Sequence, residues 1–451
     1  MADIIPFRAL RYNPQFVPDL KLVVAPPYDV ISPEAQERYH ARHPHNVVRL
    51  ILAKQDGGPM PGQDRYAHSA RTFTEWQTNG ILRRDPEPAI YLYEQEFSVG
   101  EGHRIRRRGF VAMVRLQGYD AKVIFPHERT FSHYKDDRLQ LMRACPANLE
   151  AILGFYAGKA EPITTILDRH MEEEPSVQLV DEDGIRHRLW ILRKPAEAAV
   201  LAQALQDRPI VIADGHHRYE TALNFRDERR AAEAVPGAEQ DRRLHNFVLM
   251  NLIHAEDPGL VILPTHRLIR QRPILEGALL REALGRHFRV EGFPLDPGNP
   301  VMSLRIALSD LHRRREAAAF ALYAGGTEVL VLELADPSVV EDLRSAGHSA
   351  EYARLDVAIL HRLVIERILG VRPTGLMDDS IQYTRDEEAA LSAVASGDAH
   401  LALFQNPPRV EQVQAIAMAG ERMPQKSTFF FPKVLSGLVI SPLGPAEMIP
   451  A

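Results

Sequence analysis

One segment near the middle of the chain constrains the fold more than any other. A short apolar run, 209–213, is followed by five residues that are polar or glycine, 214–218, and then by a stretch of helical composition over 219–234. This order predicts a buried strand that passes through a tight polar turn directly into a helix. Such units are typical of chains that mix the two structure types, so we expect an α/β (mixed α+β) fold.

Other parts of the chain agree with a mixed class. Apolar runs at 89–93 and 109–114 predict strands, and the sequence Gly-Glu-Gly at 100–102 predicts a hairpin turn between them. Composition changes near 265–275, after which helical stretches alternate with apolar, strand-like ones. We therefore expect two regions, 1–268 and 269–451. The first would carry the nucleotide and substrate site, and the second would contribute a loop to it.

Composition and charge exclude several classes of protein. With 45% apolar and 25% charged residues, the 451-residue chain has the balance of a globular protein. Its apolar runs end well short of the ~18 residues that cross a bilayer. Residues 1–6 contain an acid and a proline where an export signal would be basic and then apolar. A single cysteine, Cys145, can form no intrachain disulfide. We expect a cytoplasmic protein without a membrane partner.

The charge balance also bears on partners. The chain carries 54 basic and 60 acidic residues, a net charge of −6, which does not favour a nucleic-acid partner. Two local basic runs, 104–108 and 313–315, are interpreted as solvated strand or helix faces.

The polar turn contains the strongest candidate residues, Asp214, Gly215, His216, His217 and Arg218. Glycine permits a tight turn, and the N–H groups at a helix start can face an anion. Arg218 would add a charged fork for phosphate oxygens. Adjacent histidines point in different directions on a helix, so they are not expected to share a metal ion. The alternative is a helix start with surface histidines.

A second candidate is Glu128, which follows the apolar run 123–126. A carboxylate at the end of a strand could accept a proton from a hydroxyl group at the mouth of a pocket. Arg129 and Lys135 are close in sequence and could keep it ionised or bind phosphate. The alternative is a surface carboxylate that pairs with Arg129 or Arg138.

Near the N-terminus, two prolines at 26–27 force an extended backbone. Ser32 followed by Pro33 predicts the start of a helix. Tyr28 and Asp29 are therefore expected in the loop that precedes this helix.

Near the C-terminus, Lys426, Ser427 and Thr428 are similar to the end of a phosphate-binding Walker motif. The glycine loop that this motif requires is absent, because residues 423–425 are Met-Pro-Gln, so the segment is not a P-loop. Contact with a phosphate or a carboxylate, and a packing role anchored by the phenylalanines at 429–431, both remain open.

Together these segments resemble known proteins. The turn 214–218 resembles the glycine-x-x-arginine phosphate-binding turn of the ParB/sulfiredoxin superfamily. With 26–31, 126–130 and 423–438, which keep their order along the chain, the whole sequence resembles a member of the DUF1015 family. The resemblance implies a ParB/sulfiredoxin-like core in the first region. Better-understood relatives in that superfamily include free-serine kinases, which use a nucleotide to phosphorylate a small amino acid.

The resemblance implies a small-molecule phosphotransferase that moves phosphate between a nucleotide and serine or O-phosphoserine. The polar turn would hold the phosphates of ADP or ATP, Mg²⁺ would bridge them, and Glu128 would take the hydroxyl proton, assisted by His127 and His216. We expect Glu128 within about 10 Å of the turn, a distance on the order of a substrate's width. The expected substrate-binding residues are Tyr28, Asp29, Lys426, Ser427 and Thr428. Two alternatives are a phosphohydrolase of a small phosphorylated metabolite and a nucleotide-binding regulator without turnover.

Overall fold

The computed structural model describes residues 1–54, 64–100, 102–233, 236–271, 273–372 and 379–449. The chain forms two compact units, one of Met1–Val261 with Pro432–Ala451 and the other of Ile262–Phe431. The sequence predicts a single boundary after residue 268, whereas in the structure the C-terminal segment from Pro432 returns to the first unit. It does so through backbone pairing: β21 (Ser441–Pro442) pairs with β7 (Ala147–Asn148), and Ile440 exchanges two hydrogen bonds with Leu10.

The expected mixed α and β fold is confirmed. The first unit is built on a mixed nine-stranded sheet in which two neighbouring pairs are parallel and the others are antiparallel. In spatial order the strands are β6 (Ile124–Pro126), β11 (Ile210–Asp214), β8 (Ile152–Tyr156), β12 (Phe247–His254), β5 (Arg104–Arg115), β4 (Ile90–Ser98), β10 (Arg186–Leu192) and β9 (Val177–Val180), with β1 (Ile4–Ile5) paired to β5. A separate two-stranded sheet joins β2 (Leu10–Tyr12) and β3 (Leu82–Arg84).

Two sequence predictions can be followed in this sheet. Strands β4 and β5 form the expected antiparallel hairpin, with Ser98 opposite Arg104; Glu101 in its predicted turn lies outside the described residues. Strand β11 leads into α7 (His216–Ala232), which confirms the strand, turn and helix expected at 209–234, although Ala234 lies outside the described residues.

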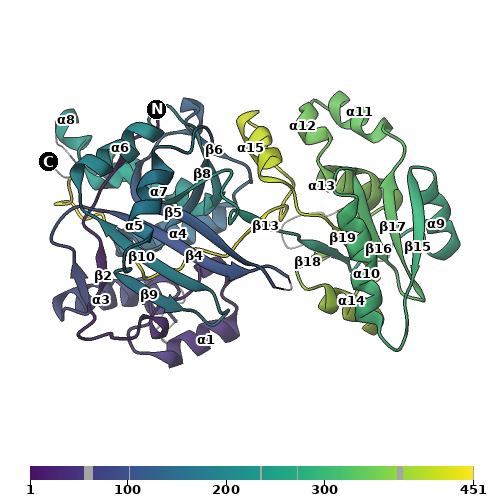
Figure 1. Ribbon diagram of the computed structural model, residues 1–451, viewed down its shortest axis with the longest axis horizontal. Coiled ribbons are helices and arrows are strands. Elements are labelled where there is room, and N and C mark those ends of the chain that lie inside the picture. Colours follow the sequence, from purple (N-terminus) through teal and green to yellow (C-terminus); the bar gives the residue numbers. More distant parts are fainter. Residues whose placement is uncertain (55–63, 101, 234–235, 272, 373–378, 450–451) are drawn as a thin grey trace. The chain divides into compact units, whose positions relative to one another are not determined.

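Helices α5, α6 and α7 lie along one face of the large sheet (Figure 1), where their apolar side chains share a core with alternate strand residues such as Ile210 and Ile212. A second hydrophobic core contains side chains from the first four helices, α1 to α4, and from the N-terminal loops. The helices of this unit are α1 (Pro33–Arg42), α2 (Val48–Ile51), α3 (Asp64–Thr78), α4 (Ser132–Ala144), α5 (Ile163–Met171), α6 (Pro195–Leu205), α7 and α8 (Gly237–Gln240). The side chain of Ser32 caps α1 by accepting from the Ala35 N–H at 3.2 Å, as its sequence predicts.

The second unit contains a six-stranded sheet in which every neighbouring pair is antiparallel. Its strands in spatial order are β15 (Phe288–Pro294), β17 (Glu328–Leu334), β16 (Ala319–Tyr323), β19 (Leu401–Gln405), β14 (His266–Ile269) and β18 (Ile381–Thr384). A short pair joins β13 (Val261–Leu263) and β20 (Phe429–Phe431).

One face of this sheet packs on α10 (Pro300–Arg313) and α14 (Glu387–Ser396), which supply most of the helical residues of its core. The other helices are α9 (Gly277–Gly285), α11 (Ser338–Ser345), α12 (Ala350–Ala353), α13 (Asp356–Ile359) with its π-helical continuation Leu360–Ile368, and α15 (Val410–Met418). None of the helices in the described ranges has the length and apolarity needed to cross a membrane.

Candidate active site

Two parallel strands bring the main candidate residues to one edge of the large sheet. β6 and β11 are parallel neighbours, with Pro126 opposite Ile212, so the residues that follow the two strands meet at their carboxyl ends. In sheets of this kind, ligands bind outside the carboxyl ends of parallel strands. The imidazole Nδ1 of His127 donates to the Ile212 carbonyl at 2.7 Å, which fixes the segment after β6 against the end of β11.

Glu128 lies beside the start of α7. One of its carboxylate oxygens is 3.9 Å from Nδ1 of His216, which confirms the expected proximity of Glu128 to the turn. The other ring nitrogen of His216, Nε2, accepts from the backbone N–H of His127 at 3.3 Å. Since Nε2 acts as acceptor, the proton of a neutral His216 is on Nδ1 and faces Glu128. The side chain of Glu128 is 31% exposed while that of His216 is 4% exposed, so a ligand can reach the carboxylate.

The turn depends on Gly215, which precedes α7 in the left-handed region with φ of 96°. A Cβ atom at this position would lie 3.0 to 3.1 Å from the guanidinium of Arg218, so the turn and the arginine are closely packed. The N-cap residue of this 17-residue helix is glycine, which has no side chain that could cap the first N–H groups. The first N–H groups of α7 and the positive end of its dipole are therefore directed at whatever occupies the space before the helix.

A buried group of charges holds the turn in place. Nη2 of Arg218 donates to Asp214 Oδ2 at 2.6 Å, and its Nη1 donates to the carbonyl of Ala151 at 2.6 Å. The ammonium group of Lys433 bonds the other oxygen of Asp214. Burial alone would favour the neutral acid, but the charges of Lys433 and Arg218 hold the pKa of Asp214 well below its usual value. The predicted phosphate fork, Arg218, thus bonds protein acceptors and braces the turn.

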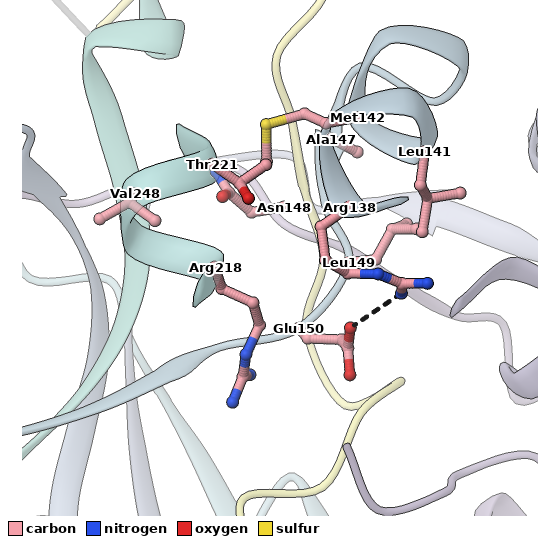
Figure 2. Close-up of a pocket in the computed structure, with 10 residues that line it drawn as sticks. All are labelled: Arg138, Leu141, Met142, Ala147, Asn148, Leu149, Glu150, Arg218, Thr221 and Val248. Atoms are coloured by element: carbon pink, nitrogen blue, oxygen red, sulfur yellow. Dashed lines mark ion pairs between the residues drawn. The ribbon is translucent and has the colours of Figure 1, made fainter. Parts of the chain in front are cut away.

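Behind the turn, Glu150 lies between Arg218 and Arg138 (Figure 2). Its Oε1 accepts from the backbone N–H of Tyr28 at 2.9 Å, and its Oε2 is 3.9 Å from Arg138 Nη1. The Arg138 guanidinium also covers the Tyr28 ring at 4.0 Å. Burial raises the pKa of Glu150, while Arg218 and Arg138 oppose this shift. Tyr28 therefore belongs to the same cluster as the turn. Asp29 is exposed, and it is close enough for its negative charge to help raise the pKa of Arg218.

Glu150, Arg138 and Arg218 line a small cavity of about 40 Å³. Its lining residues, drawn in Figure 2, are Arg138, Leu141, Met142, Ala147, Asn148, Leu149, Glu150, Arg218, Thr221 and Val248. A space of this size accommodates water rather than a nucleotide, because drug-sized ligands occupy several hundred Å³. The candidate ligand site is therefore the space before α7 and beside Glu128, and the cavity is part of its support.

The remaining turn residue, His217, points to a different side from His216, as expected for neighbours on a helix. Its Nε2 accepts from the backbone N–H of Phe131 at 3.0 Å. Lys135, considered above as a partner of Glu128, instead bonds Glu220 at 2.9 Å, and Thr130 donates to the same carboxylate at 2.6 Å. His217 thus links the loop after β6 to α7.

The C-terminal candidates fall in the second unit. Lys426 has a left-handed backbone with φ of 54° and an exposed side chain, and the hydroxyl of Ser427 donates to the Pro424 carbonyl. Contact of Lys426, Ser427 and Thr428 with substrate stays a prediction. Lys433, a few positions later in the same segment, is the lysine that reaches the turn, and sequence reasoning did not select it.

We asked whether the side chains fit Mg²⁺. Within the described ranges, no group of three or more His, Cys, Asp or Glu side chains could hold a metal ion. Mg²⁺ needs no such group when nucleotide phosphates supply most of its ligands, because one or two carboxylates then suffice. Asp214 already bonds two cations, whereas Asp29 and Glu128 are accessible. The residues fit a Mg²⁺ ion held mainly by phosphates, with Asp29 as a candidate carboxylate.

Fold and site together define a mixed α/β protein in which a strand–turn–helix lies beside an accessible carboxylate. The family model described as "Protein of unknown function (DUF1015)" matches residues 4–358. The chain therefore belongs to the DUF1015 family, as the motifs predicted.

Solved structures show weaker likeness. A free serine kinase carrying a glutamate-to-alanine substitution, in complex with ADP, is 13% identical; the match covers 69% of this chain and 87% of that chain with a TM-score of 0.31. A conserved hypothetical protein from Pyrococcus furiosus is 13% identical over 69% and 90%, with a TM-score of 0.28. SbnI with a C-terminal truncation, from Staphylococcus aureus, is 12% identical over 74% and 87%, with a TM-score of 0.32. Likeness of this degree does not bear on chemistry. Comparison with curated proteins found no match.

Proposed function

We propose that this protein is a small-molecule phosphotransferase that moves phosphate between a nucleotide and the hydroxyl group of a small acceptor. One observation carries the proposal: an accessible carboxylate, Glu128, lies 3.9 Å from His216 at the first turn of a helix whose N–H groups face outward. Phosphoryl transfer requires positioning and charge neutralisation more than covalent participation, and this arrangement supplies both.

The nucleotide phosphates would bind before α7. The helix dipole and the N–H groups after Gly215 favour an anion there. Arg218 and Lys433 add two positive charges, of which Asp214 balances one. Because both cations are held by Asp214, they stay in position without a ligand, and a phosphate group would find its surroundings already organised. Mg²⁺ would neutralise the remaining phosphate charge when bound.

Glu128 would accept the proton of the acceptor hydroxyl. The Nδ1–H of His216 faces its carboxylate and limits its orientation. The backbone N–H of His127 in turn holds His216 through Nε2, so these two histidines position the base. A carboxylate that is 31% exposed can exchange its proton with solvent after each turnover.

Serine is the acceptor that the motif resemblance to free-serine kinases suggests, with ADP or ATP as the nucleotide. The same site would run in the reverse direction, from O-phosphoserine to a nucleoside diphosphate. Tyr28 and Asp29 would contact the acceptor, and their position beside Glu150 and Arg218 supports this role.

The test is phosphorus-31 NMR of the purified protein with ADP or ATP, Mg²⁺ and a panel of hydroxy amino acids. A new phosphate ester that requires both the acceptor and Glu128 supports the proposal. Orthophosphate without an ester would indicate a hydrolase instead, and nucleotide binding without turnover would indicate a regulator. Glu75→Gln is the matched control, because it removes the same charge from an exposed position on α3 of the same unit.

A further inference from the structure

The second unit contains a cavity that the proposed reaction does not use. It has a volume of about 130 Å³ and lies where β19 ends and α13 begins. Its lining includes Gln405 at the end of β19, Asp356 at the start of α13, and Arg409 and Arg315. All of its lining residues belong to Ile262–Phe431, so its shape depends on this unit alone.

Gln405 has an unusual environment. On the same strand, Ala402 and Phe404 point into the core beneath α10 and α14. Because side chains alternate along a strand, Gln405 points to the opposite face of the sheet. The residue is 2% exposed, yet within the described part of the chain neither its Oε1 nor its Nε2 has a hydrogen-bond partner. An unsatisfied buried amide destabilises the fold, so such positions are rare without a ligand or water. Because Gln405 lines the cavity, a molecule inside can supply both missing partners.

Asp356 provides a carboxylate in the same cavity. The positive charge of Arg409 favours the ionised form of this carboxylate. However, Nη1 of Arg409 donates a hydrogen bond to Glu316 at 2.6 Å. Burial raises the pKa of Asp356 to about 7, although Arg409 opposes this shift. A partly buried carboxylate that forms no ion pair among the described residues is suited to receive a positively charged group.

A positive charge lies behind Gln405. Arg267 on β14 is fully buried, and within the described ranges its Nε and Nη2 have no acceptor. It is opposite Leu403, which makes it the diagonal neighbour of Gln405 on the same sheet face, about 7–8 Å away by sheet geometry. Arg267 does not line the cavity, but its charge favours the negative end of a ligand near Gln405.

We propose that this cavity is a binding site for a small α-amino acid. The ammonium group would face Asp356 and Oε1 of Gln405, and the carboxylate would face Nε2 of Gln405 on the side of Arg267. Arg315 at the exposed rim would attract the carboxylate during entry. A volume of about 130 Å³ admits only amino acids with short side chains. The inference does not rest on the proposed phosphotransferase activity.

The test is calorimetric titration of the full-length protein with glycine and L-alanine, and with ethylamine and propionate as analogues that lack one charged group. Binding of the amino acids at least tenfold tighter than of either analogue is the expected result. Asp356→Asn should weaken binding at least tenfold. Arg315→Gln, at an exposed position where substitutions usually change stability little, should weaken it several-fold. Glu351→Gln, which removes an exposed carboxylate of α12, should leave it unchanged.

Three results would overturn the inference. Titration without heat at millimolar concentration would mean that the cavity holds water only. Equal binding of ethylamine and L-alanine would mean that the carboxylate is not recognised. Binding that survives Asp356→Asn but is lost in Asp214→Asn would place the amino acid in the first unit. A thermal unfolding curve of Asp356→Asn like that of the wild type near pH 4, where the carboxyl group is protonated in the folded protein, shows that weakened binding is not caused by misfolding.

Discussion

The charge group around Asp214 makes a quantitative prediction about stability. The side chains of Lys433 and Asp214 are 13% and 14% exposed, so their ion pair is shielded from solvent. Lys433→Met removes one charged hydrogen bond and leaves Asp214 bonded to Arg218, which should lower the free energy of unfolding by about 2 kcal/mol. Asp214→Asn leaves two buried cations without their carboxylate and should cost about 4 kcal/mol.

The two substitutions should not be additive. In the Asp214→Asn background, Lys433→Met removes an ammonium group that has already lost its counter-ion, so its own cost should nearly vanish. The pH dependence provides a second check, because Lys433 and Arg218 hold the pKa of Asp214 below its usual value. The stabilisation by Asp214 should therefore be complete above about pH 4 and decline as the pH falls further.

Urea unfolding followed by tryptophan fluorescence measures these effects selectively, because both tryptophans, Trp76 and Trp190, lie in the first unit. Lys159→Met is the control, since it removes an exposed lysine of the same unit and should change the unfolding free energy by less than about 0.5 kcal/mol. A cost of Lys433→Met equal to or above that of Asp214→Asn, or full additivity in the double variant, would refute the argument.

Four further predictions address function and the second unit. Glu128→Gln should lower turnover by ~10²–10⁴-fold in steady-state assays while nucleotide affinity in calorimetry is kept. Gly215→Ala should weaken nucleotide binding and cost about 1–2 kcal/mol in urea unfolding, because alanine is strained at φ of 96° and its Cβ would be 3.0 Å from Arg218. Lys426→Ala should raise the substrate KM with unchanged stability, and unaltered kinetics would favour a packing role. Burial raises the pKa of Asp356 to about 7, so Asp356→Asn should match the wild type near pH 4 and exceed its stability at pH 8, by up to about 4 kcal/mol in urea unfolding.

Local patterns predicted the elements that depend on neighbouring residues. The run at 209–213 and the glycine after it determine β11, the turn and the start of α7. Ser32 determines the start of α1 in the same way, because a cap involves residues only three positions apart. The return of 432–451 to the first unit had no such signal. It rests on pairing between segments that are hundreds of residues apart, and pairing over that distance leaves no periodic trace in the sequence.

The residues of the candidate site could likewise be predicted only where a local pattern marks them. Glu128 and the polar turn were identifiable because each follows an apolar strand, and the parallel pairing of β6 and β11 then brings them together. Glu150 and Lys433 were missed. Glu150 belongs to an unremarkable stretch, and its pKa shift arises from burial that only the folded chain produces. Lys433 lies in a segment that was selected, but which of its lysines reaches the turn depends on the path of the chain after Pro432.

The position of Arg218 changes how the motif works. A phosphate fork requires both terminal nitrogens to face the ligand, whereas here one bonds Asp214 and the other bonds the Ala151 carbonyl across the turn. Lysine could not make both bonds at once, because only the planar guanidinium presents two donors in a fixed geometry. The arginine of the motif is therefore needed for the shape of the turn as well as for its charge. If the turn binds phosphate as proposed, the direct contacts would come from the backbone N–H groups of Gly215 and the start of α7, and Arg218 would stabilise the phosphate by its charge without touching it.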